Sequence, residues 1–454
     1  MSTLDELTVP KVEQTGPVAA DEFVYVDISS VDNKTKRIVD PKRLPVTEAP
    51  SRARQRLRAG DVLVSMTRPN LNAVATVPPE LDGAIGSTGF HVLRAKVDVD
   101  PRWLFNAVQS RNFIETMEKF VQGALYPAVR PKDIRGYELH VPPLEEQRRV
   151  LDDIEMQFSR LDEAVANLQR VKANLKRYKA SVLKDAVEGR LVPNESELAR
   201  REDRSFETGE QLLRRIVETR RKLWSGRGKY VESDWSMPDG LPSLPDGWTW
   251  APFGVMGKDP FNTVQTGPFG AQLHNTDFTL NGVPVIAVGN LTGTGFRRDG
   301  LYFISQKKAD QLARYDVWSG DILFARSGAT LGKVCVAPAD VSNWRMTGHI
   351  LRARLNVEFL RPEIALYALA ALPTVTKQIF GSVRGVTRPG FNTSLLESIW
   401  IPVPPLAEQK RIVTEVDSRL SLLAGVDAQV DANLKRAAKL RQSVLAAAFS
   451  LPNI

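Results

Sequence analysis

The sequence is poor in the residues and segments that metal sites, disulfides and membrane anchors need. It holds one cysteine, Cys335, and four scattered histidines in 454 residues, which excludes an intramolecular disulfide and gives no metal-ligand cluster. The N-terminus lacks a basic-then-apolar signal, and the longest apolar run, Ile364 to Leu372, is about half a membrane span. These absences predict a cytoplasmic chain with no metal and no membrane role.

Motifs for catalysis are missing as well. The segment Gly328 to Val334 resembles a phosphate-binding loop, but its first gap is one residue short and no hydroxyl follows Lys333 to hold magnesium. The tetrapeptide Asn-Pro-Pro-aromatic or Asp-Pro-Pro-aromatic, with which adenine methyltransferases hold a flipped base, does not occur, nor does a glycine-rich fingerprint for S-adenosylmethionine. We therefore expect no catalytic site and no cofactor in this chain.

The composition is that of a folded protein with a positive balance. Hydrophobic residues make up 43% and charged residues 25%, close to the average for globular domains, and the length predicts two or three domains. Lysine and arginine number 61 against 53 aspartates and glutamates, a formal net charge of +8. This balance favours a polyanionic partner, because binding releases condensed counterions, although basic connecting segments would explain it equally well.

The chain contains an internal repeat. The segment Val141 to Val150 recurs as Val403 to Ile412 at an offset of 262, with seven identities in ten. In both copies apolar residues then step by three and four, which predicts a long helix with a coiled-coil seam, interrupted at Lys172, Lys179, Asp427 and Arg441. At 1.5 Å per residue each helix would span roughly 65 Å.

Weaker matches extend the repeat upstream of both helices, at offsets between 258 and 262. Gly60-Asp-Val-Leu63 parallels Gly320-Asp-Ile-Leu323, and the segment that starts at His91 parallels the one that starts at His349. A histidine at the same place in two domains, without a nucleophile or paired carboxylate nearby, indicates packing rather than catalysis. Short β-branched runs broken by turn residues predict α+β domains with a curved sheet.

The repeat divides the chain into five parts. We expect a first recognition domain at 1–143, a long helix at 144–190, a connector with a short helix at 191–243, a second recognition domain at 244–403 and a second long helix at 404–454. The connector carries eight basic residues between Arg200 and Lys222, which we interpret as a solvated run rather than as phosphate contacts.

This plan resembles the type I restriction-modification specificity subunit family. The resemblance rests on Pro-Pro-Leu-x-Glu-Gln at the start of each long helix, Leu244-Pro-Asp-Gly-Trp-Thr-Trp250 before the second domain and Gly-Asp-[Ile/Val]-Leu inside each domain. It implies an α+β fold, with two repeated target recognition domains separated by two long antiparallel coiled-coil helices. It also implies that each domain reads one half of a bipartite DNA site and that the helix length sets the gap between the halves.

One part of the family pattern is missing from the first copy. The Leu-Pro-x-Gly-Trp opening and the segment Gln265 to Leu273 have no counterpart before the first domain, which we expect to begin near Phe23 and to be shortened.

Polar and basic loops are the candidates for contact with double-stranded DNA. Phosphate contacts position such a protein, while arginine, lysine, asparagine and glutamine side chains read base edges. In the first domain the candidates lie after the first strand, after Gly-Asp-Val-Leu and before the long helix: Lys34, Lys36, Arg37, Arg68, Asn70, Asn72, Tyr126 and Arg130. In the second domain they are Gln265, Gln272, Thr292, Arg297, Arg298, Arg326, Lys333, Arg384, Arg388 and Asn392.

The starts of the long helices carry a duplicated polar set, which consists of Glu146, Gln147, Arg149, Glu408, Gln409 and Arg411. Equivalent surfaces at two places would dock two copies of one partner. The resemblance implies that these partners are two modification subunits, which methylate adenine with S-adenosylmethionine. Restriction subunits, which use ATP and magnesium, are further expected partners. A solvated face of the coiled coil explains the same residues equally well.

The sequence thus predicts a non-enzymatic DNA specificity subunit. The rival interpretation is a coiled-coil adaptor that binds proteins through both domains. The adaptor explains the helices and the repeat, but not why the loops of the two domains differ while the helix starts remain alike.

Overall fold

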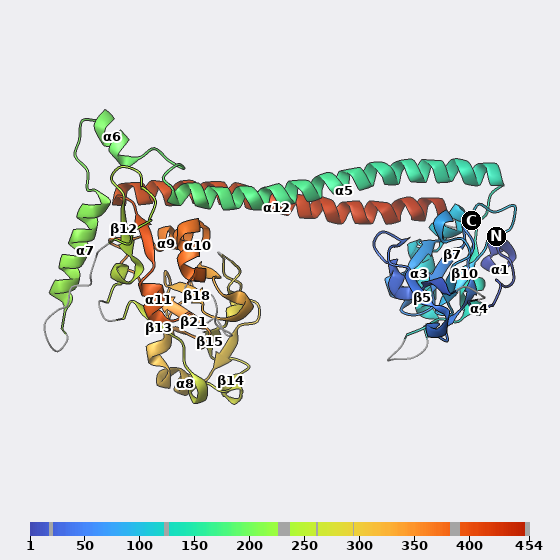
Figure 1. The fold of residues 1–454 in the computed structure, drawn as a ribbon, viewed down its shortest axis with the longest axis horizontal. Coiled ribbons are helices and arrows are strands. Elements are labelled where there is room, and N and C mark those ends of the chain that lie inside the picture. Colours follow the sequence, from blue (N-terminus) through green and yellow to red (C-terminus); the bar gives the residue numbers. More distant parts are fainter. Residues whose placement is uncertain are drawn as a thin grey trace. The chain divides into compact units, whose positions relative to one another are not determined.

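The computed structural model describes residues 1–17, 21–121, 127–225, 237–259, 262–293, 295–381 and 391–449. The chain forms two compact units, one of Met1–Val171 with Ala428–Ile454 and one of Lys172–Asp427. Each unit holds one domain of mixed helix and sheet together with part of both long helices (Figure 1). The predicted α+β class, with two repeated domains and two long helices, is confirmed.

Unit 1 contains short strands arranged in small sheets. The strand orders are β5-β2-β9-β6, β10-β7-β8, β3-β4 and β1-β11. The strands are β1 (Ser2–Thr3), β2 (Glu22–Val26), β3 (Val31–Asp32), β4 (Arg37–Ile38), β5 (Lys42–Pro45), β6 (Ala53–Arg56), β7 (Val62–Ser65), β8 (Val74–Thr76), β9 (Ile85–Ser87), β10 (Phe90–Leu93) and β11 (Glu138–Leu139). Because β1 pairs with β11, residues before Phe23 are part of the first domain, and the expected start near Phe23 is wrong.

Helices of unit 1 begin where the sequence supplies a proline or a capping side chain. The α-helices are α1 (Leu4–Leu7), α2 (Pro101–Ala107), α3 (Arg111–Lys119) and α4 (Pro131–Arg135), and the 3₁₀ helices are η1 (Ile28–Ser30), η2 (Val46–Glu48), η3 (Pro69–Leu71) and η4 (Pro79–Leu81). Pro101 and Pro131 take first-turn positions, where the missing N–H costs nothing, and the Ser110 hydroxyl accepts the Phe113 N–H.

Unit 2 repeats this plan with a larger sheet. Its strand orders are β14-β16-β15-β20-β17, β13-β21-β18-β19 and β12-β22. The strands are β12 (Thr249–Pro252), β13 (Val264–Thr266), β14 (Phe278–Thr279), β15 (Val283–Ile286), β16 (Tyr302–Ile304), β17 (Asp316–Val317), β18 (Ile322–Ala325), β19 (Val334–Val336), β20 (Trp344–Met346), β21 (Ile350–Ala353) and β22 (Trp400–Val403).

The helices of unit 2 include two in the connector. The α-helices of the unit's domain and connector are α6 (Glu195–Arg201), α7 (Gly209–Leu223), α8 (Gln306–Gln311), α9 (Pro362–Ala371), α10 (Pro373–Gly381) and α11 (Thr393–Glu397). The 3₁₀ helices are η5 (Phe253–Met256), η6 (Gly270–Gln272), η7 (Asn275–Asp277), η8 (Val288–Asn290), η9 (Ala313–Tyr315) and η10 (Gly328–Thr330). Leu212 and Ile216 of α7 are buried in the core of unit 2, as its amphipathic pattern predicts.

Strand pairing fixes how the two domains correspond. Val62 pairs with Leu93, and Ile322 pairs with Ala353, so both strands of this ladder are related by an offset of 260. The parallel pair β2 and β9 has the same register as β15 and β20 at the same offset. His349 therefore corresponds to residue 89, and the prediction that His91 and His349 occupy matching places is wrong.

The two long helices are α5 (Leu144–Val187) and α12 (Leu406–Phe449), each of 44 residues. In unit 1, Leu445 and Phe449 of α12 share a core with Leu151 and Ile154 of α5. In unit 2, Val182 and Leu183 of α5 share a core with Val413 and Val416 of α12. The start of each helix thus packs in the same unit as the end of the other, which is the predicted antiparallel arrangement.

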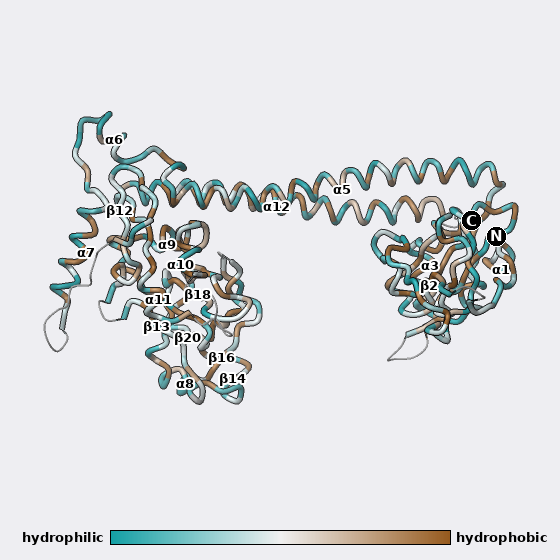
Figure 2. The backbone as a smooth tube through the Cα atoms, viewed as in Figure 1, coloured by the Kyte–Doolittle hydropathy of each residue, from teal (hydrophilic) through white to brown (hydrophobic). Residues whose placement is uncertain are grey.

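Arg441, one of the predicted interruptions of the coiled-coil seam, contacts the other long helix. The Arg441 guanidinium lies 4.2 Å from the centre of the Phe158 ring and forms an ion pair with Asp162 at 2.7 Å. Along both long helices hydrophilic residues alternate with hydrophobic ones (Figure 2). Within the described ranges no single helix is long and apolar enough to cross a membrane; the bent pair α9 and α10 passes on length and composition alone.

Candidate nucleic-acid interface

In both domains the same turn leaves the end of a buried strand. It joins β7 to β8 in unit 1 and β18 to β19 in unit 2, and it contains η3 or η10. Arg68 and Asn72 hold left-handed backbone angles, with φ of 48° and 45°, and Gly328 and Gly332 do so at φ of 68° and 88°. The glycines of the apparent phosphate-binding motif thus supply the left-handed positions of a strand turn.

The loop before the last short helix of each domain crosses this turn. The Val129 N–H donates to the Met66 carbonyl at 2.9 Å in unit 1, and the Phe391 N–H donates to the Arg326 carbonyl at 2.9 Å in unit 2. Two sequence-predicted loops are therefore brought together in each domain. Three predicted residues of these loops, Tyr126, Arg384 and Arg388, lie outside the described residues.

A lysine links the turn of unit 1 to the loop between β3 and β4. The Lys36 ammonium donates to the backbone carbonyl of Asn72 and to its Oδ1, the latter at 2.9 Å. Asn72 is buried, and its Nδ2 donates to the Val108 carbonyl at 2.8 Å. Burial, with the nearby charge of Arg441, lowers the pKa of Lys36 to about 8. Asn72 is thus a scaffold residue, and its expected exposure to DNA is corrected.

Four other predicted side chains remain exposed around this link, namely Lys34, Arg37, Arg68 and Asn70. They come from the two loops that Lys36 and Asn72 hold together, with Arg37 at the start of β4, and we call them the loop patch of unit 1. Three of the four are cationic, and Asn70 adds a side chain with both donor and acceptor groups. Arg130 is also exposed, but it pairs with Asp133 at 3.0 Å at the start of α4.

In unit 2 the turn forms one wall of a hollow of about 1150 Å³. Polar and aromatic groups from several loops meet there, and its lining includes Phe269, Tyr302, Arg326, Thr330 and His349. Phe278 and Tyr302 stack with ring centres 4.7 Å apart. A hollow of this composition offers flat apolar faces and hydrogen-bonding groups to the same ligand.

Arg326 is the predicted residue that contacts this hollow most directly. Its guanidinium lies 5.0 Å from the centre of the exposed Phe269 ring and donates to Thr266 Oγ1 at 3.0 Å. Burial lowers its pKa. Gln272 is exposed and accepts the Tyr315 hydroxyl at 2.7 Å. Gln265 is instead buried, with its Nε2 bound to the Thr266 carbonyl at 2.8 Å, so its expected exposure is corrected.

The remaining predictions for unit 2 fall on exposed or half-buried loop positions. Arg297 donates to the Gly289 carbonyl at 3.0 Å, and Arg298 pairs with Asp340 at 2.7 Å. Asn392 caps α11 by accepting the Leu395 N–H at 2.8 Å. Thr292 is exposed and Lys333 is half-buried.

Sequence reasoning missed an arginine and aspartate pair that both domains share. Arg94 holds Asp61 through two hydrogen bonds of 2.8 and 2.7 Å, and Arg354 holds Asp321 with the same two distances. Both aspartates belong to the Gly-Asp-[Ile/Val]-Leu motif, so the duplicated motif carried the signal. The sequence match placed Arg352 opposite Arg94 and obscured the pair.

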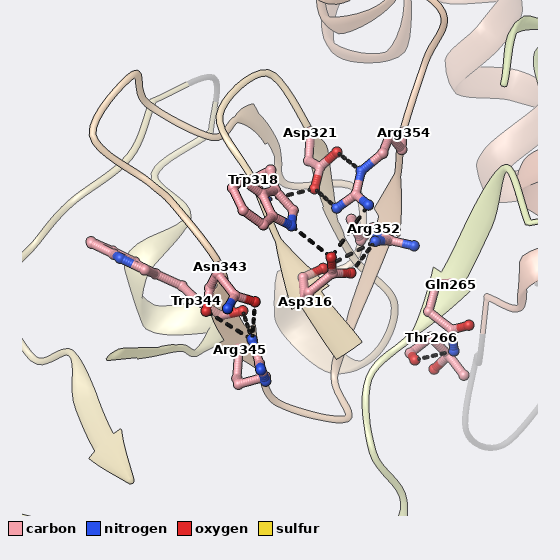
Figure 3. A network of polar contacts seen from close by, with 10 residues as sticks. All are labelled: Gln265, Thr266, Asp316, Trp318, Asp321, Asn343, Trp344, Arg345, Arg352 and Arg354. Atoms are coloured by element: carbon pink, nitrogen blue, oxygen red, sulfur yellow. Dashed lines mark hydrogen bonds and ion pairs between the residues drawn. The ribbon is translucent and has the colours of Figure 1, made fainter. Parts of the chain in front are cut away.

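Figure 3 shows how this pair extends into a network in unit 2. Arg352 is buried and donates to Asp316 Oδ1 at 2.7 Å, while Arg354 lies 3.4 Å from Asp316 Oδ2. The Trp318 N–H donates to Asp321 at 2.8 Å. Because Asp316 begins β17 and Arg352 lies in β21, the network joins the two larger sheets of the domain. Among the described residues no group of three histidine, cysteine, aspartate or glutamate side chains is suited to a metal.

At the start of each long helix a buried glutamine forms hydrogen bonds to the backbone of its own domain. Gln147 accepts the Asp100 N–H at 2.9 Å and donates to the carbonyls of Asp98 and Pro142. Gln409 accepts the Arg361 N–H at 2.9 Å and donates to the carbonyls of Phe359 and Pro404. Both side chains are buried. The prediction that they belong to an exposed docking face is therefore corrected.

The neighbouring charged residues differ between the two helix starts. Glu408 is buried and accepts the Glu195 N–H at 2.9 Å and the Trp248 indole N–H at 3.0 Å. Burial raises its pKa, and its predicted exposure is corrected. Arg411 is partly exposed and forms an ion pair with Glu195 at 2.6 Å. At the other helix start, Glu146 and Arg149 are exposed.

Comparison with known proteins gives a consistent result. Residues 271–425 match the type I restriction modification DNA specificity domain. The type I restriction enzyme EcoBI specificity subunit of Escherichia coli is 25% identical over 311 residues, which cover 68% of this chain and 57% of that protein. The match therefore spans little more than half the length of this curated relative.

Two solved structures extend the similarity over nearly the whole chain. One, from a study of complex assembly and conformational transition of the type I R-M system, is 26% identical with a TM-score of 0.69 and covers 98% of this chain and 96% of that chain. The HsdS subunit from Thermoanaerobacter tengcongensis has a TM-score of 0.54 at 24% identity, covers 98% of this chain and 95% of that one, and shares the fold.

Proposed function

On the premise that this chain belongs to the type I restriction-modification specificity subunits, we propose that each of its domains reads one half of a bipartite DNA target. The loop patch of unit 1 contacts one half, and the hollow of unit 2 contacts the other. The long helices dock modification subunits, which supply S-adenosylmethionine and methylate adenine. Restriction subunits with ATP and magnesium join the same assembly.

One observation carries the proposal. The two domains hold the same turn at the same register, yet they place different side chains on it. Unit 1 has Arg68 and Asn70 where unit 2 has Gly328 and Thr330. A fixed backbone with exchanged side chains is what two modules need to read different sequences, because base edges are distinguished by side-chain donors and acceptors.

The exposed cations support contact with a duplex. Lys34, Arg37 and Arg68 surround one turn and are suited to phosphate oxygens, whereas Asn70 has the paired donor and acceptor that match an adenine edge. In unit 2, Arg326 and the aromatic rings of the hollow offer a guanidinium fork and apolar surface for base edges.

Methylome sequencing tests the proposal. The chain is expressed with an active modification subunit, and the modified positions are compared with those of a strain that lacks this chain. We expect N6-methyladenine in both halves of a split motif, lost when the chain is deleted. Methylation by the active partner that is unchanged without this chain would reject the proposal and favour the protein-binding adaptor.

A further inference from the structure

The starts of the two long helices have nearly the same sequence but different surroundings. We define the root of α5 as residues 141–150 and the root of α12 as residues 403–412, which carry seven identities in ten. Each root is fastened to its own domain by the same glutamine contacts. Any difference in exposure between the roots therefore reflects what covers them.

The root of α12 is covered by the connector. The start of α6 donates its Glu195 N–H to Glu408, and the Glu195 carboxylate pairs with Arg411 at 2.6 Å and with Arg204 at 2.6 Å. Burial opposes ionisation of Glu195, but these two arginines hold its pKa below the usual value. The cover thus consists of a helix start led by a carboxylate, with the indole of Trp248 beside it.

At the root of α5 the same groups have no cover from the described part of the chain. Glu146 and Arg149, which correspond to Glu408 and Arg411, are exposed, and neither side chain has a polar partner among the described residues. The apolar positions follow the same trend. Pro143 is exposed and Val150 is half-buried, whereas their counterparts Pro405 and Ile412 are buried.

We propose that the root of α5 is a docking site for a partner protein that presents a helix start led by an acidic residue. The partner's carboxylate pairs with Arg149, its free helix N–H groups donate to Glu146, and an apolar side chain covers Pro143 and Val150. Charge complementarity and the internal example in unit 2 define this occupant. The inference rests on the proposed function, because the partner to be tested is the modification subunit.

This assignment replaces two equivalent docking places by one. Since the connector occupies the root of α12, the root of α5 is the one of the two that the described residues leave open to a partner with this chemistry. Partner copies would therefore not bind through identical contacts at the two roots, in contrast to the expectation from the duplicated sequence.

The test uses Arg149→Glu and Glu146→Lys in the full chain, with binding of the purified modification subunit as the readout. Each variant should weaken this binding at least tenfold, and the double charge swap should not restore it. Their melting temperatures should match that of the parent chain, because both positions are exposed. Arg411→Glu is the matched control, which should destabilise unit 2 and leave binding at the root of α5 unchanged.

Hydrogen exchange gives an independent readout. Residues 403–412 should be more strongly protected than residues 141–150 in the chain alone, and residues 141–150 should gain further protection when the modification subunit is added. Unchanged binding by both variants, or equal protection of the two roots in the chain alone, would overturn the docking site. If one of these two results were found while the parent chain still directed split-motif methylation, the docking site would be rejected and the proposed function would stand. If the parent chain directed no split-motif methylation, the proposed function itself would be rejected.

Discussion

The two turns that follow β7 and β18 show how one backbone serves two different surfaces. Both have left-handed residues at their first and fifth positions, but unit 2 fills these positions with Gly328 and Gly332 and unit 1 with Arg68 and Asn72. A residue with a side chain pays a conformational cost there of roughly 1 kcal/mol. Unit 1 offsets this cost at Asn72 through hydrogen bonds to Lys36 and Val108. Among the described residues the exposed side chain of Arg68 makes no such hydrogen bond, as a role in binding requires.

The largest effect should come from the features that the two domains share. Gln147→Ala and Gln409→Ala each remove three hydrogen bonds and leave buried backbone groups unpaired, so each should lower the free energy of unfolding of its own unit by about 3 kcal/mol. Hydrogen exchange in denaturant measures each unit separately. The exposed neighbours, changed by Arg148→Ala and Lys410→Ala, should have little effect. Equal losses in both units from one glutamine would contradict independent fastening.

The next effect should separate the two domains by function. Arg68→Ala and Arg326→Ala should each weaken binding at one half-site by roughly 1 to 3 kcal/mol, with the other half-site unaffected. The measurement is affinity for duplexes in which one half of the methylated motif is scrambled. Lys307→Ala, an exposed residue of α8, is the control for a general loss of charge. If one substitution weakened both halves equally, the domains would not read separately.

A smaller effect should raise the stability of unit 1 and lower DNA affinity through one substitution at Arg68. Arg68→Gly copies Gly328, removes the left-handed strain and should stabilise unit 1 by up to about 1 kcal/mol. It also removes an exposed cation, so affinity for the first half-site should fall. Thermal unfolding and duplex binding are measured on the same variant, with Arg68→Ala for comparison. A fall in both quantities would show that the arginine holds the turn itself.

The last effect appears only at alkaline pH. The pKa of Lys36 is lowered from 10.5 to about 8 by burial, so the folded state releases this proton before the unfolded state does. The free energy of unfolding of unit 1 should therefore rise between about pH 8 and pH 10.5, relative to Lys36→Met. Unit 2 has no lysine at the corresponding link and should show no such difference between the two proteins. If the free energy of unfolding of unit 1 changed with pH in the same way in the parent chain and in Lys36→Met, the burial of this ammonium would be contradicted.

Sequence alone predicted the parts that depend on local pattern. The repeat, the two long helices and the α+β class followed from identities around Pro-Pro-Leu and from apolar spacing. The correspondence of the histidines failed because two short similar segments matched two residues out of register, and only strand pairing reveals the offset of 260.

The site was predicted at the level of loops more than of residues. The loops around Arg68 and Arg326 do come together with the segments before α4 and α11. Asn72 and Gln265 were assigned to DNA because their chemistry suits bases, but backbone conformation turned one inward and a sheet position buried the other. The cover of Glu408 by Glu195 and Trp248, which are 213 and 160 positions away in sequence, has no local signal at all.

The matching turns give the two domains one backbone segment that holds different side chains. Residues 68–72 lie between β7 and β8, and residues 328–332 lie between β18 and β19. The left-handed first and last positions of this segment hold glycine in unit 2, and arginine and asparagine in unit 1. We expect that the exposed side chains of this segment, Arg68 and Asn70 in unit 1, can be exchanged without moving the strands on either side, whereas the buried Asn72 holds the turn in place. On the proposed function, a change of DNA target would then need new side chains on this turn and no new fold.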